Sequence, residues 1–259
     1  MTLFNFILTG TLLLVTGLAS AQMPASDASG KNVAGKNVAI ESQIAREGEW
    51  LSYRDAYRVM LPFEKYGKAK NFLQNYYQVS PKDKSLSTNA LHLTLQSKSV
   101  RLNLPLDATG RTILPLLKLA YDENAELILN QKINQFSFRS RVAIVVRADG
   151  VYETADLREA CEQALAYQNY LDASVLRGRK CVGVRFVYNK KQTEAVVEFR
   201  QADRNAKALP VAEGAAFWGQ PPDNLTTMTY LFSAWPEKGQ IITRNAPVAI
   251  SAQFDLPSN

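Results

Sequence analysis

Acidic side chains are the residues of this sequence whose types could support acid–base catalysis. A pair of carboxylates hydrolyses glycosides without any histidine, provided that the two groups face each other across a cleft. The candidates are Asp107, Asp149 and Asp156. Each has a local explanation as well, since Asp107 and Asp149 stand in turn sequences and Asp156 stands where a helix begins. A carboxylate-dependent hydrolase of cell-wall or extracellular glycan is therefore the alternative function, and the sequence assigns no catalytic residue.

The single histidine, His92, limits the other routes to catalysis. A serine-hydrolase triad needs a base, and a structural zinc site needs about four nitrogen or sulfur ligands. His92 alternates with Leu91 and Leu93 in a pattern typical of a half-buried strand, which indicates a structural role on the wetter face. Glycine-rich loops that bind nucleotides do not occur in the sequence. We therefore expect no cofactor.

An all-oxygen site for calcium is the remaining metal hypothesis. Its ligands would come from Asp107 and from the acidic stretch that contains Asp122, Glu123, Asn124 and Glu126. This stretch lacks the spacing of an EF-hand, and turn residues of this kind usually bond to their own backbone. The sequence therefore predicts no metal site.

A basic cluster is the first candidate for ligand binding. Arg177, Arg179 and Lys180 stand together, and Arg185 follows on the outer face of a predicted strand. Guanidinium groups form paired hydrogen bonds with phosphate or carboxylate, so a rigid loop that carries them suits anion recognition. A solvated surface loop is the simpler interpretation, and both are kept.

Aromatic residues in a loop are the second candidate. Trp218 follows Phe217 in a segment rich in Ala, Gly and Pro, and Trp235 stands in a later turn. Aromatic rings in loops can stack on sugars or peptides, although they also fill the open end of a β-sheet core. Trp218 and Trp235 are therefore predicted as ligand-binding residues, with core packing as the alternative.

The two cysteines, Cys161 and Cys181, are predicted to form a disulfide. Pairs of cysteines in oxidising compartments usually join, and the spacing is not that of a C-x-x-C redox motif. The bond would connect a helix to the strand that follows it.

The N-terminal residues predict export. Residues 6–18 are apolar apart from Thr and Gly, and Ala19, Ser20 and Ala21 form a small-x-small cleavage signal. We expect residues 1–21 to be a signal peptide cleaved near Ala21, which places the protein in the periplasm or outside the cell, and an uncleaved membrane anchor is the alternative because residues 1–5 contain no Lys or Arg. Residues 22–48 contain the tandem copies GKNVA at 30–34 and 35–39, and this polar stretch is predicted to be a flexible linker.

The net charge of the chain indicates which kinds of partner it could bind. The chain has 30 Lys and Arg against 24 Asp and Glu, a formal net charge of +6. Exported proteins rarely meet DNA, so no nucleic-acid partner is expected, and the excess charge is compatible with phosphates or carboxylates of the envelope. The predicted partner is an anionic envelope component or another envelope protein. No stretch after the signal peptide is long and apolar enough to span a membrane.

The first half of the folded region is predicted to be rich in short strands. Ser52 can cap a helix that Pro62 ends. Pro115 makes residues 113–119 an edge strand or an extended segment. Residues 136–138 and 142–146 read as two separate strands. Strands at about ten-residue spacing are typical of a sandwich, so residues 49–140 are predicted to form a sandwich-like lobe.

The second half, residues 141–259, is predicted to be an α+β lobe that contains the disulfide. Asp156 and Glu159 form a capping-box pattern before the principal helix. Its buried stripe is predicted to contain Leu157, Cys161, Ala164, Leu165 and Leu171.

A strand over residues 181–188 is predicted to follow this helix. Gly183 would let the helix pack over the face that carries Cys181. The strand is expected to form a hairpin with residues 194–200, and residues 201–224 are expected to form a loop. The predicted class is α+β, mainly β, with antiparallel sheets and one principal helix packed on the sheet of the C-terminal lobe.

These features favour one function over the alternative. The sequence predicts an exported, non-catalytic binding or structural module of the cell envelope, because it combines a signal peptide, a linker and a disulfide with no catalytic constellation. The carboxylate-dependent hydrolase remains the alternative.

Overall fold

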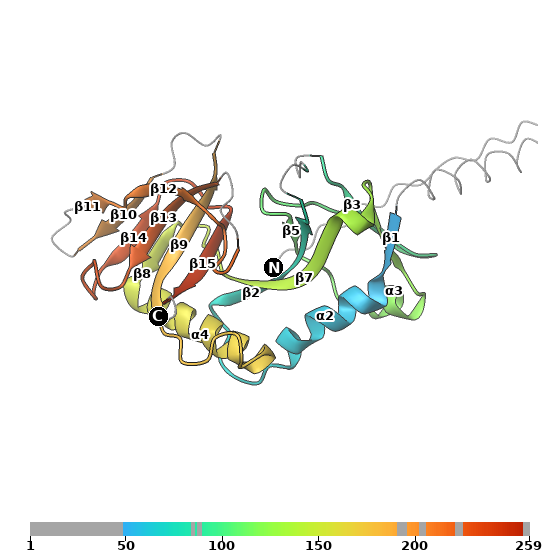
Figure 1. Cartoon of the computed structure of the whole chain (residues 1–259), viewed down its shortest axis with the longest axis horizontal. Helices are drawn as coiled ribbons and strands as arrows, with labels where there is room; N and C mark the ends of the chain where they lie inside the picture. Colours follow the sequence, from blue (N-terminus) through green and yellow to red (C-terminus); the bar gives the residue numbers. More distant parts are fainter. Residues whose placement is uncertain are drawn as a thin grey trace, which may run out of the picture. The chain divides into compact units, whose positions relative to one another are not determined.

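The computed structural model describes residues 49–83, 86, 90–190, 196–201, 206–220 and 225–255, shown in Figure 1. The predicted signal peptide and linker, residues 1–48, lie outside these ranges and stay predictions. The described residues form antiparallel sheets with few helices, and one principal helix packs on a sheet. The predicted class, α+β and mainly β, is confirmed. Within the described ranges, no helix is long and apolar enough to cross a membrane.

A seven-stranded antiparallel sheet is the largest element of the fold. Its strand order is β12-β13-β9-β15-β7-β2-β5. The strands in this order are Val211–Gly214, Leu225–Leu231, Cys181–Asn189, Ala249–Phe254, Phe136–Ile144, Leu73–Pro81 and Arg111–Thr112. The predicted division into two lobes at residue 140 falls within β7, and that division stays a prediction.

The sheet opens between β7 and β15. These neighbouring strands share a single registered pair, Ile250 with Ile144. By contrast, β7 pairs with β2 along its whole length, from Phe136 to Ile144. The two strands therefore diverge on one side of Ile250.

The remaining strands of the described residues form two four-stranded antiparallel sheets. The first has the order β1-β6-β3-β4, formed by Glu49–Ser52, Glu126–Leu129, Leu93–Gln96 and Arg101–Leu104. The second has the order β11-β10-β14-β8, formed by Ala206–Ala208, Val197–Arg200, Gln240–Thr243 and Val151–Glu153. The helices are α2 (Tyr53–Lys65), α3 (Lys118–Asp122), the single-turn η1 (Ile133–Gln135) and α4 (Thr154–Leu171).

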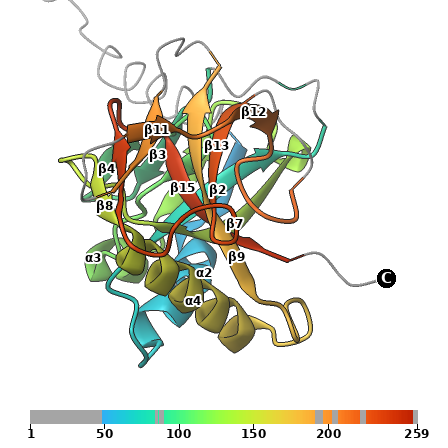
Figure 2. The same cartoon turned by 90° about the vertical axis from the view of Figure 1, so that its left-hand side faces the viewer.

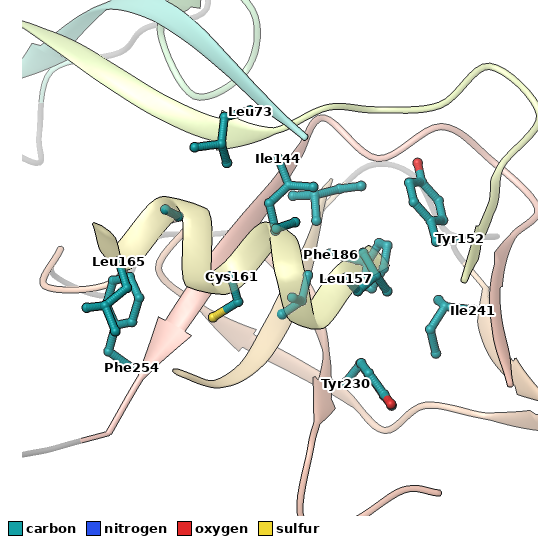
Figure 3. Packing of buried hydrophobic residues seen from close by; sticks show 14 of the residues in the cluster. Leu73, Ile144, Tyr152, Leu157, Cys161, Leu165, Phe186, Tyr230, Ile241 and Phe254 are labelled. Carbon is teal, nitrogen blue, oxygen red and sulfur yellow. The ribbon is translucent and has the colours of Figure 1, made fainter. Parts of the chain in front are cut away.

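The helix α4 packs against one face of the large sheet, as Figures 1 and 2 show. Leu157 and Cys161 of the helix belong to the same buried cluster as Phe186 of β9 and Ile250 of β15. Figure 3 shows Cys161 and Leu157 turned toward this sheet. The Cys161–Cys181 disulfide is present, with 5.9 Å between the two Cα atoms, so the predicted bond is confirmed.

The face of β9 that meets α4 differs from the prediction. The helix packs on the face of Val184 and Phe186, while Gly183 lies on the other side. A Cβ on Gly183 would lie 2.6 Å from the carbonyl oxygen of Tyr230, so the glycine permits close approach of β13 and not of the helix. The register shift at Gln253 and Phe254 places Cys181 opposite Phe254, which lets its sulfur reach α4.

The start and end of α4 also correct the prediction. The helix begins at Thr154, and its N-cap residue Glu153 makes no side-chain capping bond, so Asp156 is a first-turn residue and not the cap. The reason is that Gly239 accepts a hydrogen bond from the Thr154 backbone N–H at 3.0 Å. Leu171 is 44% exposed, whereas the other predicted stripe residues are buried.

One local prediction in the first half is wrong, and a second is wrong in part. Ser52 caps α2 as predicted, accepting from the Asp55 backbone N–H, but the helix continues through Pro62 to Lys65. Burial of Met60 and Phe63 offsets the hydrogen bond that proline cannot donate. Residues 113–117 form neither strand nor helix, so the edge-strand alternative is wrong while the extended-segment alternative is not contradicted, and residues 118 and 119 belong to α3.

The predicted hairpin in the second half is also wrong. β9 lies between β13 and β15, whereas β10 pairs with β11 and β14 in another sheet. The predicted loop over residues 201–224 contains the two strands β11 and β12. Local turn signals marked the ends of these strands without determining their partners.

Candidate functional site

A cleft of about 220 Å³ lies where β7 and β15 diverge. Arg139 and Arg141 of β7 form one wall, and Ser251 and Phe254 of β15 form the opposite wall. Residues 217–220 also line the cleft, together with the α4 residues Ala164 and Gln168 and the loop residues Val175 and Leu176. The cleft therefore combines cationic side chains with apolar and aromatic surface.

Arginines gather on the sheet face that is opposite α4. Arg111 of β5 pairs in register with Gln78 of β2, and Gln78 pairs in register with Arg139 of β7. Arg141 follows two residues later in β7 and therefore projects from the same face as Arg139. Three guanidinium groups from two strands thus converge beside the cleft.

Arg111 is the buried member of this group, with 3% of its surface exposed. Its Nε and Nη2 donate to Asp107 Oδ2 at 3.0 and 2.8 Å, and Nη2 also donates to the Val248 carbonyl at 2.7 Å. Its guanidinium carbon lies 4.3 Å from the centre of the Tyr76 ring and 5.2 Å from that of Phe217. Its Nη1 is buried and has no hydrogen-bond partner in the described structure.

Arg139 and Arg141 have no carboxylate partner among the residues that the structure describes. Arg141 Nε donates to Gln78 Oε1 at 3.0 Å, and its guanidinium carbon lies 4.9 Å from the centre of the Phe217 ring. Burial, together with the charges of Arg139 and Arg111, lowers the pKa of Arg141 to about 9. Burial also lowers the pKa of Arg139. The cleft therefore holds positive charge that its own surroundings do not neutralise.

Residues 215–220 form a strap across this arginine face. Arg185 Nη1 donates to the Ala215 carbonyl at 2.8 Å, and Ser251 Oγ donates to the Ala216 carbonyl at 2.7 Å. Trp218 Nε1 donates to the Phe254 carbonyl at 3.2 Å. Phe217, 3% exposed, lies between the guanidinium groups of Arg111 and Arg141. The backbone of the strap is thus fixed to β9 and β15.

The predicted ligand-binding residues fall at three places. Trp218 lines the cleft, and Arg185 fixes the strap without lining the cleft. Trp235 packs against Phe199 in the core, with 5.3 Å between ring centres, as the alternative interpretation of this residue expected.

The basic cluster Arg177, Arg179 and Lys180 does not line the cleft, although Val175 and Leu176 just before it do. Arg177 is exposed, and the Lys180 backbone N–H donates to Asp255 Oδ1. Arg179 Nη1 lies 3.5 Å from the Asp255 carbonyl oxygen. Arg179 and Lys180 therefore contact the strand end at Asp255, and none of the three residues lines the cleft.

The three candidate carboxylates make local contacts. Asp107 binds Arg111, and Asp156 stands in the first turn of α4. Asp149 accepts from Arg147 Nη2 at 2.8 Å and from the Val151 backbone N–H, and these bonds lower its pKa to about 2. An aspartate held ionised in this way does not supply a proton near neutral pH.

The acidic stretch considered for calcium is also engaged locally. Glu123 accepts hydrogen bonds from the hydroxyls of Ser97 and Ser99, and these bonds lower its pKa. Asp122 pairs with Lys118 one turn earlier in α3. In the described part of the chain, no group of three His, Cys, Asp or Glu side chains gathers as a metal site would require.

Sequence reasoning missed Arg111, Arg139, Arg141 and Gln220. The signal for the β7 pair was present, because Arg139 and Arg141 alternate with apolar or small residues in one continuous strand. Two separate strands, residues 136–138 and 142–146, were predicted here, and this division hid the face that Arg139 and Arg141 share. Arg111 and Gln220 carry no local signal, since they reach the cleft only through the folded chain.

No protein-family model, curated protein sequence or solved structure matches this chain. The function is therefore inferred from the cleft and from the sequence.

Replacing Arg141 by Met should change the free energy of unfolding by less than about 1 kcal/mol at pH 7. The substitution removes repulsion from Arg139 and Arg111, which offsets the loss of the hydrogen bond to Gln78. Chemical denaturation with urea measures the difference.

The difference in stability between the wild type and Arg141→Met should depend on pH. The pKa of Arg141 is about 9 in the folded chain, below its ordinary value, so the folded protein releases this proton before the unfolded chain does. The destabilisation of the folded protein by the positive charge of Arg141 is fully present below pH 9 and decreases above it. The stability of the wild type relative to Arg141→Met should therefore rise between pH 9 and 10, and a flat difference would contradict this assignment.

Proposed function

We propose that the protein is an exported, non-catalytic binding module whose cleft binds the oxyanion of an envelope component. One observation carries the proposal: Arg139 and Arg141 converge on a cleft and have no carboxylate partner among the described residues. Guanidinium groups bind carboxylate or phosphate through charge-assisted hydrogen bonds, which are stronger than neutral ones. An anionic ligand would supply the negative charge that the cleft lacks.

The surroundings of the two arginines support a ligand that is partly apolar. Trp218, Leu176 and Phe254 line the same cleft, and each presents apolar surface near the cationic wall. Small-molecule sites commonly combine such surface with a few polar groups that fix orientation. The favoured ligand therefore has an oxyanion group attached to an apolar or ring-shaped portion.

Export to the periplasm or the exterior is the second part of the proposal. The Cys161–Cys181 disulfide is of the kind that persists in oxidising compartments. The apolar run at residues 6–18 and the small residues at Ala19 and Ala21 support a cleaved signal peptide. Mass spectrometry of protein recovered from the export compartment tests cleavage after Ala21.

Hydrolysis of glycan by carboxylates has less support. Asp107, Asp149 and Asp156 are a salt-bridge partner, a turn residue and a first-turn helix residue, and none of them lines the cleft. Turnover of a glycan substrate that is lost in Asp149→Asn would support this alternative.

Isothermal titration with phenyl phosphate and with benzoate tests oxyanion binding. At pH 7 and low salt, at least one ligand should bind the mature protein, and Arg141→Met should weaken that binding at least tenfold because one charged donor is lost. Arg179→Met, which removes an arginine outside the cleft, is the matched control and should bind as the wild type does. The proposal is rejected if neither ligand binds the wild type. It is also rejected if Arg141→Met binds the ligand as tightly as the wild type does.

A further inference from the structure

The Gln220 side chain occupies the position between the two unpaired arginines. In the amide orientation that satisfies both neighbours, its oxygen accepts from Arg139 Nη2 at 3.0 Å and from Arg141 Nη2 at 3.3 Å. These are the distances at which a guanidinium group donates to an oxyanion. A neutral amide oxygen therefore stands where the oxygen of an anionic ligand would bind.

Charge balance indicates that Gln220 does not complete this site. Arg111, Arg139 and Arg141 carry three positive charges, and Asp107 is the one carboxylate of the described residues that pairs with any of them. A surplus of about two charges remains, and the amide of Gln220 neutralises none of it. Arg111 Nη1, buried and without a partner in the described structure, shows the same deficit of acceptors.

The geometry permits Gln220 to leave without moving the strap. Arg185, Ser251 and Trp218 fix the backbone of residues 215–218 through hydrogen bonds to β9 and β15. A tight turn then reverses the chain, with the Gln220 N–H donating to the Phe217 carbonyl at 3.2 Å. Rotation of the Gln220 side chain alone therefore exposes both arginines to the cleft.

We propose that Gln220 is an internal placeholder, which a dianionic phosphate monoester group displaces from Arg139 and Arg141. The inference rests on the proposed function and specifies its ligand. A phosphate monoester carries a charge of about −1.5 to −2 at neutral pH and offers three acceptor oxygens. It matches the surplus charge of the cleft, whereas a single carboxylate matches half of it. Arg111 contributes its charge from behind Phe217 and does not contact the ligand.

Two substitutions at Gln220 test the displacement by isothermal titration with phenyl phosphate. Gln220→Glu places a fixed carboxylate between the arginines and should weaken binding at least tenfold. Gln220→Ala removes two hydrogen bonds that the ligand must break and should tighten binding about threefold or more. The control is Gln96→Ala, which removes a glutamine of β3 outside the cleft; its affinity should stay within about twofold of wild type.

The outcomes separate this inference from the proposed function. Unchanged binding in Gln220→Glu, or weaker binding in Gln220→Ala, would overturn the placeholder, while the tenfold loss in Arg141→Met would still support oxyanion binding. Equal affinities of the wild type for phenyl phosphate and benzoate would contradict the inference that the cleft selects a dianionic group. Circular dichroism of each variant establishes whether it is folded. If Gln220→Glu does not fold, the affinity of Gln220→Ala still tests the displacement.

The source of the phosphate group is resolved by a competition experiment. Vesicles of phosphatidylcholine with phosphatidic acid are sedimented with the protein, with and without phenyl phosphate. Sedimentation that phenyl phosphate abolishes supports a lipid headgroup, and binding of phenyl phosphate alone supports a soluble phosphate monoester. Failure of both probes to bind overturns the inference.

Discussion

Replacing Asp107 by Asn should lower the free energy of unfolding by about 3 kcal/mol, because it leaves the charge of a buried arginine without its partner. The Arg111 side chain is 2% exposed and binds Asp107 Oδ2 through two nitrogen atoms. Arg141 and Phe217 lie close by, and neither can replace the carboxylate as a partner of the Arg111 charge. The second oxygen of Asp107 also accepts from the backbone N–H groups of Thr109 and Arg111, and an amide satisfies these bonds less well.

Urea denaturation at pH 7 measures this loss. The matched control is Asp55→Asn, which removes an exposed pair with Arg58 and should cost less than about 0.5 kcal/mol. A change below about 1 kcal/mol in Asp107→Asn would show that the Arg111 charge is solvated in the folded protein. If the cleft binds phenyl phosphate, saturating ligand should restore part of the lost stability, since binding to the folded state alone stabilises it.

Removing the disulfide should have a comparable effect. The double substitution Cys161→Ala and Cys181→Ala should lower the free energy of unfolding by about 3 kcal/mol, since the bond restricts a loop of 20 residues in the unfolded chain. Cys161 is fully buried, so loss of its sulfur adds a small packing cost. Differential scanning calorimetry with and without a reducing agent measures the effect. The reduced wild type should match the double variant, and equal stability of the oxidised wild type and the variant would contradict the prediction.

Features that depend on neighbouring residues were predicted well from the sequence. The buried positions Leu157, Cys161 and Leu165 follow from helical spacing, and all three lie in the core. The alternation of Leu93 and Leu95 with polar residues gave the half-buried strand β3, in which both leucines are fully buried. These patterns reflect the periods of a helix and a strand, which the local chain determines.

Features that depend on distant partners were not predicted. β9 and β10 are close in sequence and were expected to pair, yet they belong to different sheets. Pro62 was expected to end α2, but burial of Phe63 in the core maintains the helix past it. In both cases tertiary packing outweighs a local preference, and one sequence contains no record of that packing.

The candidate site shows the same division. Trp218 was identified as a loop aromatic and lines the cleft, whereas Arg185 was expected to bind ligand and instead fixes the strap from β9 without lining the cleft. The arginines that line the cleft were missed, because Arg139 and Arg141 matter only once β15 diverges from β7. Gln220 meets these arginines across about eighty residues of sequence, a contact that no local pattern encodes.

The position of β15 has a consequence for the order in which the chain can fold. This strand, Ala249–Phe254, follows every other strand of the large sheet in sequence, yet it lies between β9 and β7 in the middle of that sheet. Before β15 is synthesised, the earlier strands belong to two separate halves of the sheet, β12-β13-β9 and β7-β2-β5. The arginine-bearing strand β7 gains its neighbour, and the cleft its second wall, only after residue 254 has been synthesised. The cleft is thus completed only after translation of these residues, when β15 joins both halves of the sheet.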